Sequence, residues 1–258
     1  MIDKVNYNEI SPVYNDRYKQ SPLEGVEDFL TNLVHSHKPR NILEVGCGTA
    51  HWLRQLYGFD FNLFGADYSK GMLNTAQAYN KKINLFNADA LNLPLKNSSF
   101  DMIYVLNAIH HFGDPFKFIT DSFQYLKPGG IFVIIGLEPR ESRDNWYMYK
   151  YFKRTYEIDI NRFPTFTQIE TSMSNSGYSS IKVEQVHKID AFRKGREVLK
   201  DHFITKKGAS QLALLSDEEY KKGIDKIKSD IDNAEAVGEE LPFEIKLHFY
   251  AALGIKLI

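Results

Sequence analysis

The sequence predicts an α/β fold, a Rossmann-like, seven-stranded, mostly parallel, doubly wound sheet with a helical cap insertion. Short apolar runs typical of buried strands alternate with segments of helical periodicity. The first of these strands, residues 41–45, leads directly into a turn that contains Gly46 and Gly48. A chain of 258 residues is long enough for one α/β domain that carries an insertion.

Each further strand is expected where an apolar run ends in polar or turn-forming residues. Five strands are expected in the first half of the chain and two in the second, which is less regular. Strands that alternate with helices imply parallel βαβ units and a doubly wound sheet. The expected strands cover residues 41–45, 61–66, 83–86, 100–106, 131–136, 180–186 and 243–252.

Helices are expected between these strands, from Trp52 onwards, after Ser69 and over residues 115–126. Ser69 is a predicted N-cap. Two capping boxes, in which a Ser or Thr precedes a Glu or Gln by three residues, are predicted in the second half. The first pairs Thr167 with Glu170 in a helix that closes at Gly177, and the second pairs Ser216 with Glu219 in a helix that ends at Gly238.

Composition excludes several classes of protein. The net charge of −1 gives no overall electrostatic footprint for nucleic acid or a membrane surface. No apolar run approaches the length of a membrane-spanning helix, and the polar first 20 residues do not resemble a signal peptide. Cys47 is the one cysteine, so no internal disulfide can form. We therefore expect a soluble, cytoplasmic protein.

The turn at residues 46–48 predicts a ligand site at the carboxyl end of the first strand. Its glycines permit positive φ and let a ligand approach the backbone closely. A dinucleotide fingerprint needs a third glycine, where this chain has His51. The acid Glu44 precedes the loop and suits a ligand with positive charge better than a phosphate.

Acidic residues follow the second and third expected strands. Asp67 lies about 20 residues beyond Gly46, where a carboxylate can accept hydrogen bonds from a ribose diol. Asp89 could accept a hydrogen bond from an adenine amine, with Leu91 against the ring. Asp67 could instead be the acid of a helix N-terminus, and Asp89 could serve only the turn.

Three segments resemble the class I S-adenosylmethionine (SAM)-dependent methyltransferases, particularly the type 11 small-molecule group. They are E-V-G-C-G-T at 44–49, F-D-M-I-Y-V at 100–105 and L-K-P-G-G-I-F-V at 126–133. The resemblance assigns Glu44, Gly46 and Gly48 to the methionine end of SAM. It assigns Asp67 to the ribose, Asp89 to the adenine amine and Asn107 to the cofactor rim. The expected cofactor-binding residues are Glu44, Gly46, Cys47, Gly48, Asp67, Tyr68, Met72, Asp89, Ala90, Leu91 and Asn107, with S-adenosylhomocysteine (SAH) as product.

The resemblance covers residues 40–136 and implies one domain over residues 1–258. Residues 1–136 form its expected cofactor-binding half, 137–164 an aromatic substrate segment, and 188–240 a helical insertion between the last two strands. The insertion is expected to cap the carboxyl edge of the sheet or to make a dimer contact. Residues 14–18 resemble an N-terminal segment that closes over the cofactor in this family.

His110 and His111 are the candidate general bases, because they follow the fourth strand and histidine titrates near neutral pH. One of them could instead cap a helix or bind the backbone. No metal site is expected, since neighbouring histidines point apart and no acidic cluster completes a ligand set. The expected substrate-binding residues are Tyr14, Tyr18, Arg143, Trp146, Tyr147 and Arg154. The segment 146–156 could instead be a plain packed lid.

These features predict methyl transfer from SAM to an oxygen or nitrogen of a small metabolite or a natural product, which could be peptide-linked. Arg143 or Arg154 would pair with a carboxylate or phosphate of that acceptor. The alternatives are a tRNA or other nucleic-acid methyltransferase, a non-catalytic SAM-binding regulatory module and an NAD-dependent oxidoreductase. The expected partner is the acceptor, without membrane or nucleic acid, and the expected state is a monomer or homodimer.

Overall fold

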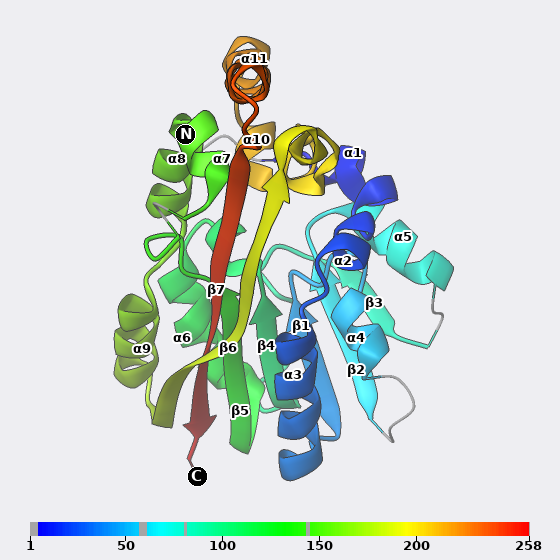
Figure 1. Ribbon diagram of the computed structural model, residues 1–258. Coiled ribbons are helices and arrows are strands. Elements are labelled where there is room, and N and C mark those ends of the chain that lie inside the picture. The colour runs from blue at the N-terminus through cyan, green and yellow to red at the C-terminus, as the bar shows by residue number, and fades with distance from the viewer. Residues whose placement is uncertain (1–4, 57–60, 80–81, 143–144, 258) are drawn as a thin grey trace.

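The computed structural model of the protein describes residues 5–56, 61–79, 82–142 and 145–257. Its centre is a seven-stranded sheet with helices on both faces (Figure 1). The strand order is β3-β2-β1-β4-β5-β7-β6. The strands are β1 Asn41–Val45, β2 Asn62–Asp67, β3 Asn84–Asn87, β4 Phe100–Leu106, β5 Leu126–Leu137, β6 Tyr178–Lys194 and β7 Pro242–Lys256.

The predicted mostly parallel sheet is confirmed. Strands β1 to β5 pair in parallel, and β7 pairs antiparallel with both β5 and β6. Strand order reverses at β1, which lies between β2 and β4. In an open α/β sheet, such a reversal leaves a crevice beyond the carboxyl ends of the strands, and ligands bind there.

Two cores, one on each face, hold the helices to the sheet. Ile42 and Tyr104 belong to the core that also contains Leu30 of α3, while Leu43 and Ile103 belong to the core of α6 and α9. Successive residues of one strand thus supply opposite faces. The helices before β5 are α1 Tyr7–Ile10, η1 Ser11–Val13, α2 Asp16–Gln20, α3 Glu24–His37, α4 His51–Gln55, α5 Lys70–Tyr79, η2 Ile109–His111 and α6 Pro115–Tyr125.

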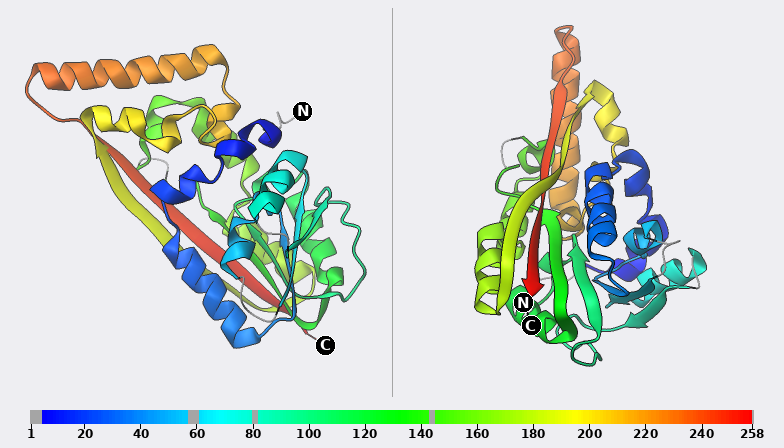
Figure 2. Two further views of the ribbon diagram at one scale, coloured as in Figure 1. Left: turned by 90° about the vertical axis from the view of Figure 1, so that its right-hand side faces the viewer. Right: turned by 90° about the horizontal axis from the view of Figure 1, so that it is seen from below.

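The helices after β5 form a cap at the carboxyl end of the sheet, except for α9, which covers one face (Figures 1 and 2). Phe152 stacks on Tyr220 of α11 with ring centroids 5.8 Å apart, and the Tyr151 hydroxyl donates to Asp230 at 3.0 Å. The aromatic segment and the insertion therefore pack on each other. These helices are α7 Tyr147–Tyr151, α8 Arg154–Arg162, α9 Phe166–Asn175, η3 Gly195–Lys200, η4 His202–Ile204, α10 Ser210–Ala213 and α11 Asp217–Ala236.

The helical insertion begins later than the expected residue 188, because β6 continues to Lys194. Residues 188–194 pair antiparallel with 242–248 of β7. Ile189 and Ala191 pack on the core while Lys188 and Asp190 form an ion pair in solvent, so the alternation of a strand persists through this segment. Both strands form an arm that carries α11 beyond the sheet (Figure 2).

Two of the three predicted helix starts are confirmed. Ser69 Oγ accepts from the Met72 N–H at 3.2 Å, and Ser216 forms a reciprocal capping box with Glu219. The predicted box of Thr167 and Glu170 is wrong, because the helix begins two residues earlier, with Thr165 as the N-cap and Gln168 as its partner. None of the helices in the described part of the chain combines the length and the apolar character that a membrane crossing requires.

Candidate active site

One cavity of about 320 Å³ lies beyond the carboxyl ends of β1, β2, β3 and β4. This volume is in the range of small-molecule sites. The wall contains most of the residues that the sequence assigned to a cofactor: Gly46, Gly48, Asp67, Tyr68, Met72, Asp89, Ala90, Leu91 and Asn107.

The two glycines of the loop meet different demands. Both have positive φ, +73° at Gly46 and +53° at Gly48. A Cβ at Gly46 would lie 2.4 Å from Ala108 Cβ, so a side chain would separate the β1 and β4 ends. A Cβ at Gly48 would meet only Tyr14 Cε1, at 3.9 Å. Gly48 thus keeps the loop backbone open to a ligand, as a cofactor cradle requires.

Asp67 anchors the loop and also lines the cavity. Its Oδ2 accepts from the Gly48 N–H and its Oδ1 from the Ser69 N–H, both at 2.7 Å. Burial raises the pKa of Asp67, although these hydrogen bonds favour the charged form. Each carboxylate oxygen retains a further acceptor site. The structural role near Ser69 and a role toward a ribose diol are therefore compatible.

Asp89 likewise combines the two roles that the sequence left open. Its Oδ1 accepts from the Leu91 N–H at 2.9 Å, which closes a local turn. Asp89, Ala90 and Leu91 nevertheless line the cavity together. The turn places a carboxylate beside an apolar side chain, an arrangement that suits an adenine base.

Glu44 and Cys47 lie behind the wall rather than on it. Glu44 is 1% exposed and accepts a hydrogen bond from the Tyr104 hydroxyl at 3.0 Å. Burial raises the pKa of Glu44 well above its ordinary value, which favours the protonated carboxyl. Cys47 is buried against Gly65, where an added Cβ would lie 2.9 Å from the sulfur. Cys47 fills space in the loop.

His110 and His111 both line the cavity, and neither caps the following helix, whose N-cap is Asp114. His111 Nε2 lies 2.6 Å from the Tyr7 hydroxyl oxygen. His110 stacks on Phe163 with ring centroids 3.8 Å apart. Burial, followed by the charge of Arg162, lowers the pKa of His111 to about 3. Burial also lowers the pKa of His110 well below its usual value, so both rings are neutral at pH 7.

The N-terminal segment closes over the glycine loop. Asn8 Oδ1 accepts from the Ser69 hydroxyl and from the Gly71 N–H, both at 2.8 Å. Further along, the Thr49 hydroxyl donates to Asn15 Oδ1 at 2.6 Å. The segment therefore contacts both the β1 loop and the start of α5.

The predicted substrate-binding residues are only partly at the cavity. Tyr14 lines it, whereas Tyr18 stacks on His51 behind it with ring centroids 3.7 Å apart. Trp146 and Tyr147 instead pack inside the cap, edge-on to Tyr149 and Phe243 respectively, because the cap needs these rings to fill its own core. Arg154 forms an exposed ion pair with Glu219 at 3.2 Å. Arg143 lies outside the described residues.

Arg162, at the end of α8, is the most consequential residue that the sequence did not single out. It lines the cavity, and its side chain is 5% exposed. Its Nη2 donates to Asp159 Oδ1 at 2.7 Å and to Ser210 Oγ at 3.1 Å. The i, i+3 spacing of Asp159 and Arg162 is typical of an ion pair on a helix. The spacing does not indicate that this face of the helix lies toward the cavity. Tyr7, Asn8 and Phe112 also line the cavity without having been predicted.

Charges on the cavity wall are separated by sign. Of its described acidic residues, Asp67 ends β2 and Asp89 follows β3, whereas its described cationic residue, Arg162, comes from the cap. Over the described ranges, no group of three or more His, Cys, Asp or Glu residues is arranged to hold a metal ion.

Comparison with known proteins identifies the cofactor-binding half. Residues 43–134 match the family model described as a methyltransferase domain. A Mycolicibacterium smegmatis protein named "Probable S-adenosylmethionine-dependent methyltransferase" is 26% identical over 102 residues, which are 40% of each chain. A tRNA (carboxymethyluridine(34)-5-O)-methyltransferase from Saccharomyces cerevisiae is 35% identical over 107 residues, which are 41% of this chain and 36% of the relative. The chain thus matches less than half the length of these relatives.

A solved structure resembles a larger part of the chain. Haemonchus contortus phosphoethanolamine N-methyltransferase 2, in complex with phosphomonomethylethanolamine and SAH, superposes with a TM-score of 0.54 and 19% identity. The similarity covers 85% of this chain and 49% of that one. At this identity it supports the fold alone. The sheet order and the match of residues 43–134 to a methyltransferase domain agree with the resemblance to the class I SAM-dependent methyltransferases.

Proposed function

We propose that the protein is an enzyme that transfers the methyl group of SAM to an oxygen or nitrogen of a small metabolite or natural product. One observation carries the proposal. A single cavity joins two carboxylates suited to adenosine, an open glycine loop and a pair of neutral histidines. The carboxylates and the glycine loop would bind the cofactor, and the histidines would contact the acceptor, which is the nucleophile.

The wall residues fit SAM. Asp67 would accept hydrogen bonds from the ribose diol and Asp89 one from the adenine amine, while Met72 and Leu91 would contact the ring. The open backbone at Gly48 would accommodate the methionine end. When bound, SAM supplies a methyl group that its sulfonium charge activates toward displacement.

The histidine pair provides a proton acceptor. A neutral His111 can take a proton from a hydroxyl or amine, and the Tyr7 hydroxyl at 2.6 Å fixes the orientation of its ring. A pKa of about 3 makes His111 a weak base in the free protein. Alignment and exclusion of water by the N-terminal segment would therefore supply most of the rate enhancement.

A small acceptor is favoured over tRNA by the modest size of the cavity, about 320 Å³, and by the net charge of −1. The match to the yeast tRNA enzyme covers 41% of this chain, so it does not extend over the whole fold. Cofactor residues alone do not select an acceptor.

Methyl-labelled SAM tests the proposal directly. Purified protein is incubated with cell extract separated into small-molecule, peptide and RNA fractions, and the labelled product is identified by mass spectrometry. We expect label in the small-molecule or peptide fraction. Label in RNA would support the tRNA alternative, and SAM binding without transfer to any fraction would support a regulatory module.

Two substitutions test the cofactor assignment. Asp67→Ala removes the proposed ribose acceptor, and Gly46→Val forces a side chain against Ala108 at positive φ. Each should weaken SAM binding at least tenfold, or about 1.4 kcal/mol, in calorimetry. Asp121→Ala, at a carboxylate of α6 paired with Lys117, is the matched control. Full affinity in both variants, with folding verified by circular dichroism, would refute the assignment.

A further inference from the structure

We propose that Arg162 forms an anion subsite at the cap end of the cavity and that the methyl acceptor carries a carboxylate or phosphate that binds there. The inference rests on the proposed function, because it concerns the acceptor of that reaction. The sequence suggested the same chemistry for Arg143 or Arg154, but the structure brings a different arginine to the cavity.

The guanidinium of Arg162 has unused hydrogen-bonding capacity inside the protein. Asp159 and Ser210 are both partners of its Nη2. Its Nε is buried and has no hydrogen-bond partner among the described residues. A buried donor without a partner is unfavourable, and such groups are commonly satisfied by a ligand or water. An oxyanion is the ligand that best fits a guanidinium.

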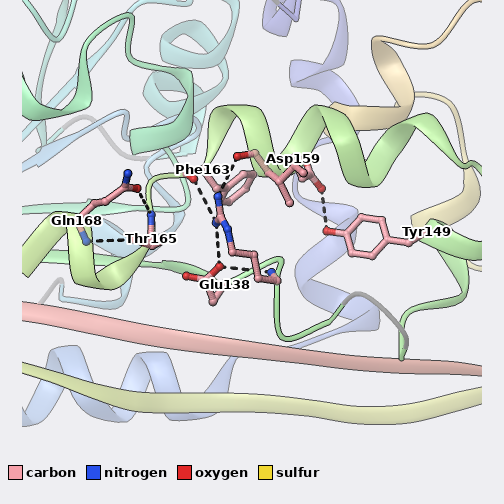
Figure 3. Close-up of polar contacts among 8 residues, drawn as sticks. Glu138, Tyr149, Asp159, Phe163, Thr165 and Gln168 are labelled. Carbon is pink, nitrogen blue, oxygen red and sulfur yellow. Dashed lines mark hydrogen bonds and ion pairs between the residues drawn. The ribbon is translucent and has the colours of Figure 1, made fainter.

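The ion pair with Asp159 involves Nη2 and leaves the Nε edge of the Arg162 guanidinium without a partner in the described structure. Asp159 shares its carboxylate with the Tyr149 hydroxyl, which donates to Oδ2 at 2.9 Å (Figure 3). Burial raises the pKa of Asp159 to about 6 despite its arginine partner. The carboxylate thus positions Arg162 within a strongly desolvated environment.

A second buried arginine adds positive potential at the same end. Arg17 Nη2 donates to the Gly208 carbonyl at 3.1 Å, and its guanidinium lies 3.9 Å from the centre of the Tyr14 ring. Arg17 Nε is likewise buried without a partner in the described structure. The charges of Arg162 and Arg17 both lower the pKa of His111, so both act on the ring that faces the cavity.

The helix that carries Arg162 is also held by residues that follow β5. Arg140 Nη2 donates to the Ile160 carbonyl at 3.0 Å, and Arg140 Nη1 pairs with Glu138 at 3.1 Å. Figure 3 shows Glu138 near Phe163, which follows α8, and near the capping box of Thr165 and Gln168 that begins α9. Because these contacts anchor α8, the guanidinium of Arg162 needs little reorganisation to bind an anion.

These contacts give the acceptor an orientation. The acids that suit adenosine lie at the ends of β2 and β3, while Arg162 lies beside His110 and His111 in the same cavity. An acceptor whose anion binds Arg162 would present its remaining part toward the histidines and the glycine loop. The His110 ring, stacked on Phe163, would form a flat wall along it.

Anion binding to the SAH-loaded protein tests the subsite. Calorimetry is performed with inorganic phosphate and with benzoate at constant ionic strength. The test variant is the double substitution Asp159→Asn with Arg162→Gln, which removes both charges and leaves no unpaired buried acid. Arg154→Gln, at an exposed arginine of the same helix, is the control. Binding of SAH to each protein is measured separately.

We expect the wild type to bind at least one of the two anions. Arg154→Gln should bind the same anion with a dissociation constant within twofold of the wild-type value. The double variant should bind that anion at least tenfold more weakly and SAH within twofold of the wild type. Equal anion binding by the double variant, or none by the wild type, would overturn the inference. A tenfold loss of SAH affinity would also overturn it, because Arg162 would then hold the methionine carboxylate of the cofactor. Failure of the proposed function is distinct, since the wild type would then fail to bind SAH or to transfer label.

Discussion

The side chains at the centre of the cavity are titratable groups whose charge is suppressed by burial. His111 has its pKa lowered to about 3, and the pKa of Tyr7, its hydrogen-bond partner, is raised above the usual range, mainly by burial. The pair is therefore neutral at pH 7. A neutral pair can exchange a proton with an acceptor without placing a new charge in a dry site before the reaction begins.

Burial of a neutral histidine has a measurable consequence for stability. The unfolded state binds a proton near pH 6.5, while folded His111 does so only near pH 3. The stability that this difference confers above pH 6.5 is lost as pH falls, by up to about 1.4 kcal/mol per unit. His111→Gln retains a partner for Tyr7 and does not titrate. When the pH is lowered from 7 to 5, the free energy of unfolding of the wild type should fall by about 2 kcal/mol more than that of His111→Gln.

Urea unfolding of SAM-free protein at both pH values measures this difference. His37→Gln, at an exposed histidine of α3, is the control and should track the wild type. Asp159 also titrates, because its pKa is raised to about 6, and its contribution makes stability fall as pH rises toward that value. This contribution is the same in every variant, so it cancels when the variants are compared. Parallel pH profiles for His111→Gln and the wild type would show that His111 is not held neutral by the fold.

The sequence allows site residues to be predicted where their place at the cavity is set by the end of a strand. Asp67 and Asp89 follow strands, and parallel strands bring their carboxyl ends to one edge. Arg162 was not predictable, because its role depends on the rotation of a helix. Arg154 lies eight residues earlier on α8, and at about 100° per residue the two side chains point about 80° apart. One meets Glu219 in solvent and the other lines the cavity.

Element boundaries show where local patterns are insufficient. Thr165 and Thr167 are each followed three residues later by a residue that can complete a capping box. Thr165 is the N-cap because it directly follows Pro164, which disfavours helical backbone at Phe163. Similarly, the length of β6 depends on pairing with β7, whose residues lie 48 to 78 positions further along the chain, and a local pattern does not reveal this pairing.

Helix α1 of the N-terminal segment packs against α5 beside the cavity. This packing requires glycine at position 71 of α5. At Gly71, an added Cβ would lie 2.9 Å from Asn8 Cα, within the backbone of α1. Gly71→Ala should therefore displace α1, although alanine favours a helix over glycine by about 1 kcal/mol. We expect faster dissociation of SAH by stopped-flow measurement and faster hydrogen exchange over residues 5–15.

Asn74→Ala provides the matched control, since it places alanine at an exposed position of the same helix. This variant should keep the dissociation rate and the exchange pattern of the wild type. Unchanged SAH dissociation in Gly71→Ala would show that α1 does not retain the ligand.

At the scale of the whole molecule, the cap is continuous with the sheet. One core contains Leu30 and Ile42 from the sheet side together with Phe152, Leu212 and Ile227 from the cap. Burial that is shared across two regions makes them unfold together, because separating them would expose both apolar surfaces. We therefore expect the chain to behave as one cooperative unit, as a single domain should.

The two tryptophans allow this expectation to be tested, because each reports on a different region. Trp52 lies on α4 beside the glycine loop, and Trp146 lies at the start of α7 in the cap, both 4% exposed. In Trp52→Phe and in Trp146→Phe, the fluorescence of the remaining tryptophan should follow the same urea transition as far-UV circular dichroism. SAH at 100 times its dissociation constant should stabilise both regions by about 2.7 kcal/mol, although it contacts mainly one of them. A Trp146 transition at lower urea than the circular dichroism change, unmoved by SAH, would show that the cap unfolds as a separate unit.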